Sequence, residues 1–238
     1  MYLFMICVFG FHLGSFLLCM CDQYIQHDFR MRSRCDACKH LLHWYDLIPV
    51  ISFVACRGKC RYCGSKVSPR YLCSEVGMGL LCMFVVRRTN FCMDMWNISL
   101  LCVLVAVGYI DMCTMEIPDG THIVIILLYM LHASRNHVMW IEDCIRMLGV
   151  FGMGVLLYVV TKYTFGRECI GGGDLKLISV MSLYLTIHKL SVVLCVGSLM
   201  AMGMMFVYRK ERIAFGPFLA IGFFMEYYGV FAMMTAIL

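Results

Sequence analysis

The chain has 238 residues, of which 62% are hydrophobic and only 15% are charged, and its formal net charge is +5. Soluble domains carry a smaller apolar fraction and about one quarter charged residues, so the composition excludes an ordinary soluble enzyme. Several apolar runs approach or exceed the ~18 residues that a helix needs to cross a bilayer. These runs indicate a lipid bilayer as the surroundings of the chain. No nucleic-acid signature is present, so we expect no nucleic-acid partner.

The apolar runs predict an all-α polytopic membrane protein with about eight transmembrane helices. Residues 1–20 lack the basic start and the small-residue cleavage site of a signal peptide, so we expect a retained first helix. A polar insert, residues 21–70, separates this helix from a membrane domain of residues 71–238. Further spans are expected at residues 71–86, 95–109, 122–131, 148–163, 175–187, 191–208 and 215–238, with Pro217 in the first turn of the last.

The basic residues predict the orientation of the chain. If the insert lies in the cytoplasm and the spans alternate, fifteen lysines and arginines fall on the cytoplasmic side and five on the other. Cytoplasmic loops carry such an excess, which supports this orientation and places both termini outside.

The insert contains two Cys-x-x-Cys pairs, Cys35–Cys38 and Cys60–Cys63, with twenty-one residues between them. Each pair can hold a metal from a tight turn, so the pattern predicts a zinc-knuckle-like site with four thiolate ligands. A structural zinc ion would fold a loop that lacks a sufficient core of its own. The alternative is two thiol pairs without a metal, and Cys56 is a possible decoy ligand.

A carboxylate, Asp174, directly follows the three glycines Gly171–Gly173 at the start of an apolar run. Charged groups at membrane depth are expensive and indicate a functional site. Glycines are poor helix formers but let another chain approach the backbone closely. The alternative is a loop in which Asp174 caps the next helix.

A second carboxylate, Asp111, ends the expected span 95–109, and Pro118 ends the turn that follows. In the predicted orientation Asp111 and Asp174 both lie at cytoplasmic helix ends. Asp111 could instead be an interfacial charge that reaches water, and Glu116 and Asp119 are expected to be such loop charges.

Together these motifs resemble the type IV prepilin peptidases, which are GxGD-type membrane aspartyl proteases. Residues 171–177, Gly-Gly-Gly-Asp-Leu-Lys-Leu, are similar to the family pattern Gly-x-Gly-Asp-x-Lys-Leu. The other segments that correspond to family motifs are Asp111 with residues 117–119, the two cysteine pairs, and residues 14–17, 43–50, 57–61 and 215–219. The chain departs from the usual family residues at Leu18, Asp36 and Ala214, none of which is one of the two acids.

The resemblance implies an aspartic endopeptidase of the bacterial inner membrane that cuts the basic leader from prepilins or pseudopilins at the cytoplasmic face. It also implies that Asp111 and Asp174 are catalytic. Gly171, Gly172, Gly173 and Lys176 are the expected substrate-binding residues. Methylation of the new amino terminus with S-adenosylmethionine is implied by the resemblance alone, because no strand is expected before the glycines.

Two carboxylates about 5 Å apart repel by roughly 3 kcal/mol at an effective dielectric near 20, so we expect the pair to share one proton. Asp174 begins a helix, where the dipole favours an anion, so it is the expected base and Asp111 the expected acid. Asp46, Glu75, Glu116 and Asp119 are candidates to meet the basic leader. The alternative functions are a non-catalytic zinc-bearing assembly factor and an ion-coupled transporter.

Overall fold

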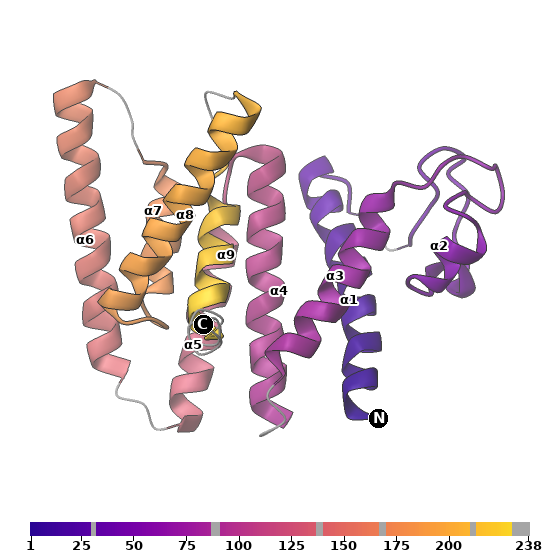
Figure 1. Ribbon diagram of the computed structural model, residues 1–238, viewed down its shortest axis with the longest axis horizontal. Coiled ribbons are helices and arrows are strands. Elements are labelled where there is room, and N and C mark those ends of the chain that lie inside the picture. The colour runs from indigo at the N-terminus through magenta and orange to yellow at the C-terminus, as the bar shows by residue number, and fades with distance from the viewer. Residues whose placement is uncertain (30–31, 87–90, 137–139, 167–169, 210–212, 230–238) are drawn as a thin grey trace. The chain divides into compact units, whose positions relative to one another are not determined.

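The computed structural model describes the chain except for residues 30–31, 87–90, 137–139, 167–169, 210–212 and 230–238 (Figure 1). The described residues form helices and two isolated β-bridges, and they contain no strand. The chain divides into two compact units, Met1–Ile98 and Ser99–Leu238. The helices are α1 (Tyr2–Gln26), η1 (Trp44–Leu47, a 3₁₀ helix), α2 (Ile51–Ala55), α3 (Pro69–Val85), α4 (Phe91–Thr114), α5 (Asp119–Asn136), α6 (Trp140–Phe165), α7 (Gly172–Met181), α8 (Ile187–Tyr208) and α9 (Gly216–Tyr227).

Four of the described helices, α1, α4, α6 and α8, are long and apolar enough to cross a membrane. This confirms a polytopic helical membrane protein, although the predicted number of eight spans goes beyond these four. The prediction of one apolar helix over 175–187 was wrong, because α7 ends at Met181 after ten residues. Ten helical residues extend for about 15 Å, which is half of the hydrocarbon thickness. Part of the predicted span 215–238 lies outside the described residues.

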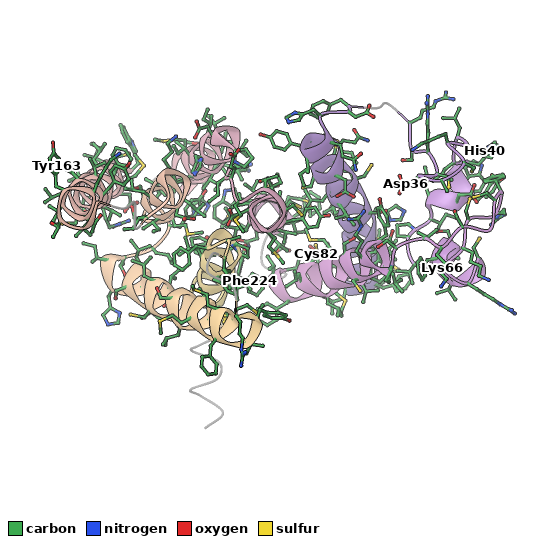
Figure 2. The ribbon with its side chains drawn as sticks, turned by 90° about the horizontal axis from the view of Figure 1, so that it is seen from above. Asp36, His40, Lys66, Cys82, Tyr163 and Phe224 are labelled. Atoms are coloured by element: carbon green, nitrogen blue, oxygen red, sulfur yellow. The ribbon has the colours of Figure 1, made fainter. Side chains whose placement is uncertain are left out.

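In the first unit, small residues let α1 and α3 pack closely together. A Cβ atom added to Gly14 would lie 2.5 Å from the Ser74 carbonyl oxygen, and one added to Gly10 would lie 2.7 Å from the Gly79 Cα atom. Small residues allow such close approach of helices in membranes. Cys82 of α3, labelled in Figure 2, is fully buried.

A buried carboxyl group ties the insert to α3. The Glu75 side chain belongs to a residue that is only 7% exposed, and its carboxylate accepts a 2.7 Å hydrogen bond from the Val50 amide. A buried carboxylate needs such a donor. The expectation that Glu75 meets a basic leader was therefore wrong, because its carboxylate is occupied inside the unit.

In the second unit α7 packs against α5, α6 and α9. Its carboxyl end is fixed by Arg146 of α6, whose Nε donates to the Ser182 carbonyl oxygen at 2.8 Å. Arg146 also pairs with Asp143. The Tyr184 hydroxyl, just beyond α7, donates to the Ile125 carbonyl oxygen of α5 at 2.7 Å. The bond to Ser182 satisfies a carbonyl that the helix end leaves free, and both bonds fix the position of the short helix that carries Asp174.

Candidate active site and metal centre

Asp111 lies in the last turns of α4 and is only 4% exposed. Its Oδ2 accepts a 2.7 Å hydrogen bond from the backbone amide of Gly216, the first residue of α9. The first amides of a helix have no partner within the helix, so this one is free to hold a carboxylate. Pro217 stands in the first turn of α9, as the sequence predicted.

Gly216 is a residue whose role the sequence reasoning missed. A Cβ atom added there would lie 2.7 Å from Asp111 Oδ2, so only glycine lets α9 approach the acid this closely. The motif in residues 215–219 was a signal for this segment, but nothing local in it indicates contact with Asp111, which lies 105 positions away.

Asp174 is the third residue of α7 and is half-buried. The suggestion that Asp174 caps this helix was wrong, because the N-cap residue is Gly171. Gly172 and Gly173 form the first turn of α7. The carboxylates of Asp111 and Asp174 lie close enough to interact electrostatically.

The three glycines before Asp174 differ in their surroundings. A Cβ atom added to Gly173 would lie 3.3 Å from Ile117 Cβ, whereas one added to Gly172 would meet nothing within 4 Å. A Cβ atom added to Gly171 would lie 3.0 Å from Asp174 Oδ2. Gly171 and Gly173 are therefore the close-approach positions, and Gly172 faces open space.

Lys176 and Asp119 form an exposed ion pair that joins the starts of α7 and α5. The Lys176 Nζ donates to Asp119 Oδ1 at 2.6 Å. The hydrogen bond and the positive charge of Lys176 lower the pKa of the Asp119 carboxyl. Lys176, a predicted substrate-binding residue, thus has a partner within the chain. Asp119 is exposed, as expected, but it is the first residue of α5 and carries this cation.

The two cysteine pairs of the insert come together in the first unit. The Sγ atoms of Cys35, Cys38, Cys60 and Cys63 all lie within 4.8 Å of one another, and those of Cys35 and Cys63 are 3.9 Å apart. Four thiolates at about 2.3 Å from a tetrahedral zinc ion lie about 3.8 Å from each other, so the cluster fits a metal.

Local donors favour the thiolate form of two of these cysteines. The backbone amide of Cys38 lowers the pKa of Cys35 to about 6, and the Ser65 hydroxyl lowers the pKa of Cys63. The thiolate is the form that binds a metal. Cys56 lies outside the cluster and accepts a hydrogen bond from Arg61.

The loop around the cluster has its own polar network. Asp46 accepts a 2.8 Å hydrogen bond from the Tyr62 hydroxyl and pairs with Arg61 at 3.3 Å, and its side chain is 8% exposed. Asp46 is therefore occupied within the loop and does not meet a basic leader as expected. Figure 2 labels Asp36, His40 and Lys66 on this loop.

Two family descriptions match the chain: "Bacterial Peptidase A24 N-terminal domain" over residues 8–89 and "Type IV leader peptidase family" over residues 98–207. The prepilin leader peptidase/N-methyltransferase of Stutzerimonas stutzeri is 31% identical over 206 residues, which cover 81% of this chain and 70% of the relative. This chain belongs to the type IV leader peptidase family. The resemblance seen in the sequence is confirmed.

Other relatives carry the same description as prepilin leader peptidase/N-methyltransferase. That of Myxococcus xanthus is 33% identical over 206 residues, which cover 81% of this chain and 58% of the relative. That of Vibrio cholerae is 24% identical over 208 residues, covering 84% of this chain and 81% of the relative. The chain thus spans little more than half of the length of the Myxococcus relative. No solved structure matches the chain, and the relatives do not favour a transporter or a non-catalytic assembly factor.

Proposed function

We propose that this member of the type IV leader peptidase family is a membrane aspartic endopeptidase that removes the basic leader from type IV prepilins or pseudopilins. The observation that carries the proposal is that two helices of one compact unit bring Asp174 within electrostatic range of Asp111. The names of the relatives support the substrate class.

In the proposed reaction the two aspartates share one proton. The ionised carboxylate takes a proton from water, whose oxygen attacks the carbonyl carbon of the scissile peptide, and the protonated acid donates to the carbonyl oxygen. Collapse of the tetrahedral intermediate breaks the C–N bond, and the leaving amine receives a proton from the pair.

The identity of the resting base stays a prediction. The dipole of α7, whose first turn contains Asp174, favours the ionised form of Asp174. The Gly216 amide adds a donor that favours the anion at Asp111 instead. Infrared spectra of Asp111→Asn and Asp174→Asn decide between the two, because only one substitution removes the band of the protonated carboxyl.

The glycines provide a surface for an extended substrate. Gly171 and Gly172 are exposed, and a substrate backbone can lie against them without meeting side chains. Lys176 lies next to this surface with its partner Asp119. Of the acids considered for the leader, Glu116 and Asp119 remain, because both are exposed.

A structural zinc ion fits the four cysteines, where Cys35, Cys38, Cys60 and Cys63 would hold it through their thiolates. The ion would supply a cross-link for the insert and no chemistry. Methyl transfer with S-adenosylmethionine is proposed from the names of the relatives alone. No described strand precedes Gly171–Gly173, so these glycines do not fit a dinucleotide-type site and no step is assigned to that cofactor.

We place the enzyme in the bacterial inner membrane as a multi-pass protein, with the acids at the cytoplasmic face. Residues 1–20 would form the first span, residues 21–70 the four-cysteine loop and residues 71–238 the protease domain. The excess of basic residues on the predicted cytoplasmic side supports this arrangement.

The test is co-expression with a prepilin that carries a basic leader, followed by gel shift and mass spectrometry of the pilin amino terminus. We expect cleavage by the natural chain and none by Asp111→Ala or Asp174→Ala, both of which should retain the expression level of the natural chain. Mass spectrometry also reports whether the new terminus is methylated. Cleavage that survives both substitutions would exclude the aspartic mechanism.

A further inference from the structure

His122 is a buried polar residue that the proposed reaction does not use. It lies in the first turn of α5 and is 5% exposed. Among the described residues, neither Nδ1 nor Nε2 of its imidazole has a hydrogen-bond partner. Buried polar groups in native proteins are nearly always paired, so an unpaired ring at this place requires an explanation.

The surroundings of His122 link it to the candidate active site. Its ring lies near the backbones of Gly173 and Asp119 and near the charges of Asp119 and Lys176, although neither ring nitrogen meets the geometry of a hydrogen bond. Gly173 in turn packs against Ile117 and directly precedes Asp174. The imidazole therefore lies beside the peptide segment that directly precedes Asp174.

We propose that His122 is a positioning residue for Asp174, which it orients through a hydrogen bond to the Gly173 backbone in the reacting enzyme. The bond is not made in the free chain. A substrate lying along the glycines would press on this segment, and a small shift of Gly173 would bring its carbonyl into line with an imidazole N–H. An interaction that forms only on the way to the transition state raises kcat and leaves substrate binding unchanged.

The inference rests on the proposed function and makes a prediction that separates positioning from packing. His122→Leu removes two unpaired polar nitrogens and keeps an apolar side chain of moderate size. Replacement of a buried unpaired polar group by an apolar one is neutral or favourable for folding. We therefore expect an unchanged or higher thermal midpoint, together with a fall of about tenfold or more in kcat at unchanged KM.

The experiment uses the full-length protein in detergent, with a purified prepilin that carries a basic leader as the substrate. His122→Gln keeps a donor and an acceptor and should recover part of the lost kcat. His188→Leu, an exposed histidine of α8 in the same unit, is the matched control and should cleave like the natural chain.

Each other outcome contradicts the inference. A natural kcat in His122→Leu would show that the ring plays no part in the reaction. A loss of kcat with a matching loss of thermal stability would show that it only packs. Equal loss in His122→Leu and His122→Gln would exclude the hydrogen bond. If the natural chain itself does not cleave the prepilin, the proposed function is wrong. The natural chain therefore tests the proposed function, and the His122 variants test the inference.

Discussion

In the first unit the buried carboxyl group of Glu75 accepts a hydrogen bond from the Val50 amide. Asp46 accepts a hydrogen bond from the Tyr62 hydroxyl and forms an ion pair with Arg61. In the second unit the buried imidazole of His122 has no hydrogen-bond partner among the described residues. Paired buried groups hold a fold together, whereas groups left with unused capacity are typical of sites that act on another molecule. We therefore expect the polar network of the first unit to be structural and the reaction to belong to the second.

The two units also use glycine for different purposes. Gly10 and Gly14 remove side chains between two helices, so that α1 and α3 can pack backbone against backbone. Gly216 and Gly171 remove side chains next to an acid, so that Asp111 and Asp174 keep their places. A substitution of the first kind should therefore change stability, and one of the second kind should change turnover.

The largest expected effect is that of metal removal from the first unit. Structural zinc contributes about 10–16 kcal/mol in small zinc-binding peptides, and the short loop around Cys60 has little core of its own. A chelator, or Cys60→Ser, should abolish hydrogen-exchange protection in residues 35–66. Protection in the second unit and prepilin cleavage should remain.

Cys56→Ser is the matched control for this experiment, since Cys56 lies outside the cluster. It should retain one bound metal ion per chain by elemental analysis. Loss of cleavage together with loss of the metal would contradict the separation of the two units into a structural and a catalytic part.

The next largest effect is expected from Gly216→Ala. The added Cβ atom would lie 2.7 Å from Asp111 Oδ2, so the acid or the start of α9 must move. A misplacement of about 1 Å in a catalytic group can cost about 100-fold in rate, and we expect a loss of this size in prepilin cleavage. Gly203→Ala is the control, because a Cβ atom there would meet nothing within 4 Å, and equal rates in the two variants would exclude the contact with Asp111.

The two cysteine pairs and the two acids could be predicted from the sequence because their signals are local. Each cysteine pair forms its own turn, and Asp111 and Asp174 each follow a recognisable change in composition at a helix end. The contact between Gly216 and Asp111 could not be predicted, because the choice of the amide that meets an acid depends on packing between helices distant in the chain.

The helix ends show the same limit. Hydropathy extends the sixth apolar run to residue 187, whereas α7 ends at Met181. The carbonyl of Ser182, just past that end, is held by Arg146, which comes from another helix. Similarly, the charge of Glu75 suggested exposure in the sequence, but a donor from the insert allows its burial.

A smaller effect should separate two glycines of the second unit. In Gly173→Ala the new Cβ atom would lie 3.3 Å from Ile117 Cβ, which displaces the turn before Asp174, and we expect about a tenfold loss of cleavage. Gly152→Ala of α6 is the control, since a Cβ atom there meets nothing within 4 Å. Alanine is the better helix former by up to about 1 kcal/mol, so neither variant should weaken its own helix. Equal activity of the two variants would remove the close-approach argument.

The smallest expected effect concerns the exposed pair of Asp119 and Lys176, which lies beside the site but is open to water. Because Lys176 lowers the pKa of Asp119 in the folded chain, the pair stabilises the fold above the unfolded pKa of about 4. That contribution is lost as the pH falls through the lowered folded value. The thermal midpoint of the natural chain should therefore exceed that of Asp119→Asn slightly at pH 7, and the two should converge near pH 3. A pH-independent difference for Asp119→Asn would mean that the side chain acts by packing and not through its charge.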